Sequence, residues 1–581
     1  MKTVHLPVVT FHHLSTKCEI LNFVSAALIA LPFLFPFVDG PSANVWQLLA
    51  SWLCIALLFL AGPRAQPSRW PLTALALLAT AIAWRGAGGD TSMVLGAFVA
   101  VGAMALAAFV GAGLARATPS AQSTLAWGLL LAGVLSAVLG LLQYYGAAAP
   151  LKPFTTTPDL GQAYGNLRQR NQFATLISMA LVAALWLHAS VVSGRGRIGR
   201  MWRMWRMWRI SLLPAIGLLV LAAAASTSRT GLLQWVSICG VAAVLAWGER
   251  RSSPGQQTRL PHPLLLLGLV PAYFVAAWVL PMLAGPEVED MLRRLRVGAP
   301  EGNSRLLLWR NVMDLIALHP WVGWGWGELS YAHFSTLYSG PRFVEILDNA
   351  HNLPLQLAVE AGIPASLAIC GVFAAMVFAA RPWRERDPMR LMAWGVLGAI
   401  VLHSLLEYPL WYGPFQLVFG LCLGLLWPAS RATVEPMTPS SRAPGIVVVF
   451  TAAMLLSAVG YAAWDYTRIS QIYIARADRQ APWRDDTLNR LQASWLYAGQ
   501  VRFAALTLMP VTPANAAEVH ALASRVVHFS PEPKVIAKLV ESAMLLGRED
   551  EAAGWAARFK IAFPVEYAQW LAGKPMEEPK P

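Results

Sequence analysis

Apolar residues in this chain gather into long runs that are separated by short polar segments. Most of these runs are about 15–25 residues long, the length that a helix needs to cross a hydrocarbon core of about 30 Å. The thirteen runs cover residues 21–38, 45–61, 71–84, 92–114, 125–145, 173–190, 211–225, 231–247, 263–284, 353–379, 391–408, 413–428 and 446–464. Two of them, 71–84 and 211–225, are short enough to be tilted or re-entrant. The pattern predicts an all-α, polytopic membrane helical bundle of about 12–13 transmembrane helices.

The charged residues are few and unevenly distributed. Only 13% of the 581 residues are charged and 56% are hydrophobic, about half the charge of an ordinary soluble domain. If the N-terminus is cytoplasmic, the inward segments hold twenty Lys and Arg residues, whereas the short outward loops hold Arg85, Lys152, Arg168, Arg170 and Arg229. This is the positive-inside bias, and it predicts a cytoplasmic N-terminus. The net charge of +14 therefore reflects topology and argues against nucleic-acid binding.

The hydropathy pattern divides the chain into four parts. Residues 1–284 hold nine apolar runs, 285–352 form a long outward loop, 353–465 hold the remaining runs, and 466–581 form a charged, soluble tail. Helices are expected in the loop at 288–297 and 304–318. The tail segment 541–552, with Phe563 and Pro564 closing the next helix, predicts one tetratricopeptide-like (TPR-like) helical hairpin. Long loops with their own motifs tend to carry function, so the 285–352 loop is the first place to look for a site.

Residues 201–209 repeat Met-Trp-Arg three times. Basic residues interleaved with aromatic ones can bind single-stranded nucleic acid. Here they stand just inside a predicted span, where Trp belongs at the interface and Arg faces anionic headgroups. We therefore expect the repeat to contact anionic lipids at the cytoplasmic face.

The segment His351-Asn-Leu-Pro-Leu-Gln-Leu-Ala-Val-Glu360 has the strongest catalytic pattern. Asn352 is a good N-cap and Pro354 suits a first helical turn, so a helix is expected to begin here. Asn352, Gln356 and Glu360 then recur every four residues and predict a polar stripe behind His351. His351 precedes the positive end of that helix, where an anionic phosphate is favoured. Taken alone, His351 is equally compatible with a helix-capping role.

Several arginines fall on the outward side, where topology disfavours them. Arg170, Arg229 and Arg305 lie at predicted helix ends or in the long loop, and a guanidinium pairs bidentately with phosphate oxygens. Arg168 is better interpreted as a helix cap or a snorkelling anchor. Together the arginines predict a site for a phosphorylated lipid.

A further polar patch is His403-Ser-Leu-Leu-Glu-Tyr408. His403 and Glu407 are four residues apart and so share one helical face, where they are expected to support the site or to form a structural polar contact. Two ligands alone do not make a metal centre, and no HExxH, Walker loop or outward Asp-x-Asp motif is present. We expect neither a metal nor another cofactor.

These motifs resemble those of the bacterial superfamily of O-antigen ligases, Wzy-type polymerases and protein O-oligosaccharyltransferases, and most of all the branch that glycosylates pilins. The matching pieces are Gln169-Arg-Asn171 with Phe173-Ala174, Ser228-Arg-Thr-Gly231, His319-Pro320 followed by Gly323-Trp-Gly-Trp-Gly327, His351-Asn-Leu-Pro-Leu-Gln356, and His403-Ser-Leu-Leu-Glu-Tyr-Pro409. They spread over about residues 20–430. The resemblance implies an inner-membrane enzyme whose active site and tail face the periplasm.

The resemblance also implies a reaction and roles for individual residues. Such enzymes transfer a glycan from undecaprenyl diphosphate to a hydroxyl, and the essential histidine of their outer loop corresponds to His351. Their phosphate-binding arginines correspond to Arg170 and Arg229, with Arg305 a weaker match. Important polar residues of the protein-glycosylating branch fall at Gln169 and Tyr408.

One position departs from the family pattern. Relatives often carry His where this chain has Gln172, which removes a possible acid/base partner and places more weight on His351. The mechanism expected from the resemblance is metal-independent. His351 withdraws the proton from a Ser or Thr hydroxyl of a periplasmic, pilin-like protein, and a single displacement inverts the anomeric centre.

Two other functions fit parts of the pattern. An O-antigen ligase or Wzy polymerase shares the chemistry but uses lipid A core or a second lipid-linked glycan as acceptor. A membrane transporter is the other class, but transporters place ionisable residues near the bilayer midplane and show repeated halves. Here the ionisable candidates gather at the outer ends of the predicted spans.

Overall fold

A computed structural model describes residues 9–37, 40–42, 44–193, 201–252, 258–285, 288, 291–297, 304–430 and 443–576. These residues form helices joined by turns, and an isolated bridge between Pro67 and Pro428 is the single β contact among them. The all-α prediction is confirmed.

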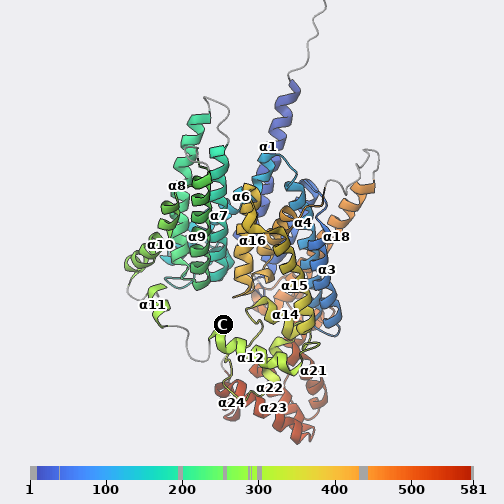
Figure 1. Cartoon of the computed structure of the whole chain (residues 1–581). Helices are drawn as coiled ribbons and strands as arrows, with labels where there is room; N and C mark the ends of the chain where they lie inside the picture. Colours follow the sequence, from blue (N-terminus) through green and yellow to red (C-terminus); the bar gives the residue numbers. More distant parts are fainter. Residues whose placement is uncertain are drawn as a thin grey trace, which may run out of the picture.

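Each of the thirteen predicted apolar runs overlaps a helix of the bundle in the upper part of Figure 1, and twelve of them correspond to a single helix. These helices are α1 (Val9–Leu34), α2 (Val45–Ala61), α3 (Arg69–Arg85), α4 (Thr91–Leu114), α6 (Thr124–Tyr144), α7 (Arg170–Ser193), α8 (Met201–Ala225), α9 (Arg229–Ser252), α10 (Pro263–Ala284), α15 (Ile363–Ala380), α16 (Pro388–Ser404), α17 (Gly413–Leu426) and α18 (Ala443–Ser470). A four-residue helix, α5 (Pro119–Gln122), precedes α6.

The described residues contain seven helices that are long and apolar enough to span a membrane. Four more apolar helical stretches are shorter: 19–34 of α1, α2, 212–225 of α8, and α17. The two predicted runs that belong to neither group, 71–84 and 391–408, form α3 and α16, which have 17 residues each. The chain is a multi-span membrane protein.

One predicted span is wrong in its extent. The run 353–379 is not one helix, because the backbone breaks at Gly362 into a short helix α14 (Leu353–Ala361) and the longer α15. Gly362 has φ +86°, which only glycine adopts without strain, and Pro364 suits the first turn of the new helix. A Cβ at this position would also lie 2.3 Å from the Trp321 carbonyl oxygen. Because of this break, the axis of α14 need not follow that of α15 in the bundle.

Helices α4 and α17 pack at very close range through glycines. A Cβ on Gly424 would lie 1.9 Å from the Ala108 carbonyl oxygen, and one on Gly111 would lie 2.1 Å from that of Leu421. Lipid tails give no hydrophobic drive for helix association, so small residues that let backbones approach are the usual solution inside a membrane. This contact fixes α17, which begins just after the segment that contains Glu407.

The long loop and the tail form a second helical region at one end of the bundle, in the lower part of Figure 1. The loop contains α11 (Met291–Val297) and α12 (Arg305–Leu318), close to the two helices expected there, and a third helix, α13 (Leu329–Ser335), that was not expected. The tail contains α19 (Thr487–Leu491), α20 (Ala498–Leu508), α21 (Ala516–Phe529), α22 (Pro533–Leu545), α23 (Glu549–Ala562) and α24 (Pro564–Leu571). Helices α22 and α23 form the expected hairpin, with Gly547 at φ +71° in the turn. Its relation to TPR repeats stays a prediction.

The tail packs on the loop although the sequence separates them. Phe334 of α13 is buried in the apolar core of the tail and stacks on Trp555 with ring centroids 6.1 Å apart. Tyr331 stacks on His528 at 3.8 Å, and the Arg558 Nε donates to the Ser335 carbonyl oxygen at 2.8 Å. The predicted divisions at 285–352 and 466–581 therefore meet in one shared core.

The Met-Trp-Arg repeat begins helix α8. Its side chains lie outside the described part of the chain, so the expected contact with anionic lipids stays a prediction.

Candidate active site

His351 stands at the start of α14 in a strained backbone conformation. Its φ is +50°, a region that non-glycine residues seldom occupy and that costs about 1–3 kcal/mol. Its backbone N–H donates to Asn349 Oδ1 at 2.8 Å, and Asn352 caps the helix by accepting from the Leu355 N–H at 3.1 Å. The Asn352 side chain also donates to the Leu405 carbonyl oxygen at 3.0 Å. These contacts hold the imidazole against the segment that follows α16.

Glu407, in that segment, is the direct partner of His351. Its Oε2 lies 2.6 Å from His351 Nδ1, while Arg305 and the Asn171 amide, at 2.8 Å, both bond Oε1. Burial of Glu407 favours a raised pKa, but the hydrogen bond and charge of His351, together with the charges of Arg305 and His403, lower its pKa below the ordinary value. When Nδ1–H of a neutral imidazole donates to ionised Glu407, Nε2 is the ring nitrogen that can accept a proton.

The imidazole is packed as well as hydrogen-bonded. The Tyr408 and His351 rings meet edge to face, with centroids 4.9 Å apart and planes at 78°. Burial, with the neighbouring charge of Asp348 and Glu407, raises the pKa of Tyr408, so its hydroxyl stays protonated. The His351 side chain is 18% exposed, enough for one face to meet a substrate.

The second part of the site is a group of arginines around Thr227, which lies between α8 and α9 and has φ +48°. Arg170 NH1 donates to Thr227 Oγ1 at 3.3 Å, and Arg294 NH1 donates to the Thr227 carbonyl oxygen at 3.2 Å. Arg229, the first residue of α9, donates to the Arg294 carbonyl oxygen. Arg170 and Arg229 are thus linked through Thr227 and Arg294, and sequence reasoning missed Arg294. The sequence feature that could have identified Arg294 is the basic run at 293–296, inside a helix expected in the long loop.

Asn171 joins the two parts. Its Nδ2 bonds Glu407, and its Oδ1 accepts from Ser228 Oγ at 2.6 Å. Ser228 Oγ in turn accepts from the Gly231 N–H at 2.9 Å, which fixes the first turn of α9. Both residues stand inside motifs that the sequence pointed to, yet neither had been given a role. Their hydrogen bonds place the His351–Glu407 pair and the Thr227 arginines in one connected site.

The other predicted residues support the site from further away. Gln169 Oε1 accepts from the Gln172 N–H at 2.6 Å and so caps α7 beside Arg170. His403 is buried and its Nδ1 lies 2.9 Å from Thr175 Oγ1, which ties α16 to α7. Arg168 bonds the carbonyl oxygens of Phe35, Pro36 and Phe37, a structural role that agrees with its interpretation as an anchor.

The predicted polar stripe does not lie against His351. Gln356 Oε1 accepts from the Ala350 N–H at 2.7 Å, and Glu360 Oε1 accepts from the Gly327 N–H at 2.9 Å. Both side chains are buried against the main chain of the long loop. Of the stripe, Asn352 alone positions His351 directly; the other two shape the loop.

Comparison with known proteins gives three matches to family models. Residues 163–188 match "Protein glycosylation ligase", residues 214–370 match "O-Antigen ligase", and residues 391–575 match "Virulence factor membrane-bound polymerase, C-terminal". The first covers Arg170 and Asn171, the second covers Arg229, Arg294, Arg305 and His351, and the third covers Glu407 and the tail. These parts of the chain are similar to O-antigen ligases and to a protein glycosylation ligase.

Two curated relatives agree with these matches. A general O-oligosaccharyltransferase of Acinetobacter baylyi is 24% identical over 521 residues, 86% of this chain and 85% of that protein. A ComP-specific O-oligosaccharyltransferase of the same organism is 26% identical over 126 residues, 22% of this chain and 23% of that protein. The expected resemblance is confirmed, and the chain is an enzyme of the glycosyltransferase type.

Proposed function

We propose that this enzyme transfers a glycan from undecaprenyl diphosphate to a Ser or Thr hydroxyl of a periplasmic, pilin-like protein. The observation that supports it is the His351–Glu407 pair, joined through Asn171 to the arginines around Thr227. The proposed reaction deprotonates a hydroxyl and releases a diphosphate. It therefore needs a general base beside a cluster of cationic side chains. Both named relatives are O-oligosaccharyltransferases, which favours a protein acceptor.

The proposed chemistry is a single displacement. Nε2 of His351 takes the proton of the acceptor hydroxyl while its oxygen attacks the anomeric carbon and forms the new glycosidic bond. The bond from that carbon to the diphosphate oxygen breaks, and the leaving diphosphate takes its electron pair. Ionised Glu407 stabilises the imidazolium that forms, and Arg170 and Arg229 neutralise the leaving group. The attack inverts the anomeric centre and uses no metal.

The proposed location follows from the charge distribution. Basic residues gather in the segments assigned to the cytoplasm. We therefore propose that the N-terminus lies on the cytoplasmic side of the bacterial inner membrane and the His351 site on its periplasmic side. That is the side where a folded acceptor protein is accessible.

Replacing His351 by Ala tests the assignment most directly. We expect transfer from a lipid-linked glycan to a pilin-like acceptor to fall at least about a hundredfold, because the acceptor proton loses its base. The measurement is glycosylated product formed by the purified full-length chain. The matched control is His262→Ala, whose ring caps α10. Near-normal transfer in the His351 variant would contradict the mechanism.

Arg229→Lys tests the leaving-group site. Lys keeps the charge but not the two-pronged guanidinium, so we expect a drop of about tenfold in kcat, as for one lost bidentate phosphate contact. Arg310→Lys, on the exposed face of α12, is the control. Equal rates in the two variants would remove Arg229 from the proposed site.

The polymerase-type match over 391–575 favours one alternative, in which the acceptor is a second lipid-linked glycan or lipid A core. Offering the purified enzyme a pilin-like protein, lipid A core and a lipid-linked glycan in parallel separates these acceptors. Transfer to lipid alone would replace the protein-glycosylation proposal.

A further inference from the structure

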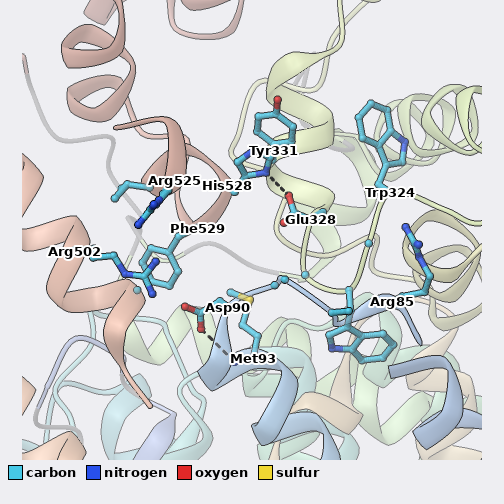
Figure 2. A pocket seen from close by; sticks show the side chains of 18 of the residues that line it. Arg85, Asp90, Met93, Trp324, Glu328, Tyr331, Arg502, Arg525, His528 and Phe529 are labelled. Atoms are coloured by element: carbon cyan, nitrogen blue, oxygen red, sulfur yellow. Dashed lines mark hydrogen bonds and ion pairs between the residues drawn. The ribbon is translucent and has the colours of Figure 1, made fainter. Parts of the chain in front are cut away.

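A cavity of about 850 Å³ lies where the long loop, the tail and the turn between α3 and α4 meet. Figure 2 shows Arg502, Arg525 and Phe529 of the tail on one side of it, and Arg85 and Trp324 on the other. Asp90 and Met93 at the start of α4 close one end, and Glu328 and Tyr331 of the loop close the opposite end. Three distant parts of the chain therefore build one concave site.

This cavity is separate from the His351 site but is connected to it by helix α14. His351 precedes the helix, whereas the cavity loop is bonded to its other end. There the Trp324 N–H donates to the Val359 carbonyl oxygen at 2.8 Å, and the Gly325 N–H donates to that of Glu360 at 3.1 Å. A nine-residue helix is about 13 Å long, so the cavity lies a few sugar residues from the proposed reaction centre.

The walls combine aromatic faces with bare main chain. Trp84 is 52% exposed, and Trp324, Tyr331 and Phe529 are partly exposed along the cavity. Glycines supply much of the remaining surface, and a Cβ on Gly88 would meet nothing within 4 Å. The negative face of an aromatic ring attracts the C–H face of a pyranose, while open main-chain groups and polar side chains meet its hydroxyls.

The charges favour an anionic ligand. Asp90 is occupied in capping α4, and Glu328 bonds His528 Nδ1 at 2.8 Å. In the described parts of the chain no carboxylate pairs with Arg85, Arg502 or Arg525, and the Nε of Arg85 has no hydrogen-bond partner there. The three guanidinium groups, which pair with no carboxylate in the described residues, outnumber the two bonded carboxylates that line the cavity, and this balance favours a carboxylate ligand.

We infer that the cavity binds an acidic oligosaccharide, the part of the transferred glycan that lies beyond its diphosphate-linked sugar. The inference rests on the proposed function for the identity of the glycan as substrate. A folded acceptor protein fits less well, because a stable protein interface covers about 800 Å² per partner, whereas this site is a concavity of about 850 Å³, the size that holds small ligands. Binding here orients the distal sugars while the diphosphate reaches the Thr227 arginines.

The test measures binding without transfer, by titration calorimetry on the full-length chain in nanodiscs. The probes are tetragalacturonate, neutral maltotetraose and hexaglutamate. We expect tetragalacturonate to bind the wild-type chain more tightly than either other probe. The double variant Arg502→Gln/Arg525→Gln should bind it at least about tenfold more weakly, and Trp84→Ala about threefold to tenfold more weakly.

Two matched controls keep the result specific. Arg548→Gln removes an exposed tail charge away from the cavity, and Trp321→Ala removes a loop tryptophan that is 74% exposed and does not line it. Both should bind tetragalacturonate as the wild-type chain does. No binding to the wild-type chain, unchanged affinity in the double arginine variant, equal affinity for maltotetraose, or tighter binding of hexaglutamate would each overturn the inference.

The outcome is independent of the reaction mechanism. His351→Ala should keep full affinity for tetragalacturonate, because His351 stands at the other end of α14. If that variant still transferred glycan, the proposed mechanism would fail while the binding result remained valid. If it lost transfer but the cavity variants bound normally, the cavity assignment alone would fail.

Discussion

Two buried glutamates stand close to the two ends of α14, in opposite electrostatic surroundings. Glu407 meets His351, Arg305 and Asn171, and these partners lower its pKa in spite of its burial. Glu360 is also buried, but its bonds to the Gly327 N–H and to Gln356 do not offset that burial, which raises its pKa to about 8. One carboxyl is therefore charged at neutral pH and the other is mostly protonated.

The difference separates a chemical role from an architectural one. A buried charge is costly, so Glu407 is maintained by cationic partners that a reaction also needs. Glu360 avoids that cost by keeping its proton, and it uses its oxygens to hold the Gly-Trp-rich loop against α14. Sequence spacing suggested a supporting role for both glutamates, whereas the structure pairs Glu407 with His351 and bonds Glu360 to Gly327 of the long loop.

Glu407→Gln should have the largest effect in this comparison. A neutral amide cannot stabilise the imidazolium, and its NH₂ can bond Nδ1 and leave Nε2 protonated, so we expect a loss of about 10²–10⁴-fold in the transfer rate. Substrate affinity should change much less. The measurement is kcat with KM for the lipid-linked glycan. A variant within threefold of wild type in kcat would show that the charge of Glu407 is not used.

Arg305→Lys should have an intermediate effect. Arg305 bonds the same carboxyl but its side chain is 43% exposed, and Lys keeps a charge near Glu407 without the planar fork. We expect a drop of about threefold to tenfold in transfer, by analogy with one weakened charge-assisted contact. Arg310→Lys on the same helix serves as the control. A loss as large as that of Glu407→Gln would instead assign Arg305 to the diphosphate.

Glu360→Gln should have the smallest effect on transfer and should act on stability. Folding raises the pKa of Glu360 from 4.5 to about 8. Its contribution to the free energy of unfolding is therefore fully present below about pH 4.5 and is lost as pH rises through 8. Gln keeps an acceptor for Gly327 but does not titrate. We expect Tm of the variant to exceed that of wild type by about 2–4 °C at pH 9 and to match it near pH 5. Parallel profiles of Tm against pH would contradict the protonated state of Glu360.

Much of the fold was predictable because its signals are local. Twelve of the thirteen apolar runs correspond to a single helix, and Asn352 caps α14 as its side-chain chemistry predicts. The break at Gly362 was missed because the apolar pattern continues across it, and only the close approach of the Trp321 main chain makes glycine necessary there. Hydropathy reports burial in lipid and does not distinguish one helix from two.

The site was predictable in its residues but not in its pairing. His351, Arg170, Arg229 and Arg305 were expected from their positions at helix ends. The bond between Asn171 and Glu407 joins residues 236 positions apart, so no local pattern encodes it. Arg294 lies in a visible basic run at 293–296, but its contact with Thr227, 67 positions away, depends on tertiary packing, so its role was missed. Spacing identifies candidates, whereas tertiary packing decides their partners.

The insertion of Phe334 into the tail core has a consequence for the order of events during synthesis. The helices that cover Phe334 begin at Ala516, so the ribosome reaches them roughly 10–40 s later at about 5–20 residues per second. During that interval the last four bundle helices, α15 to α18, are made, and Phe334 of α13 lacks the tail helices that bury it. The nascent chain therefore completes its membrane helices before its cavity. A chain truncated before the tail leaves the apolar surface around Phe334 exposed.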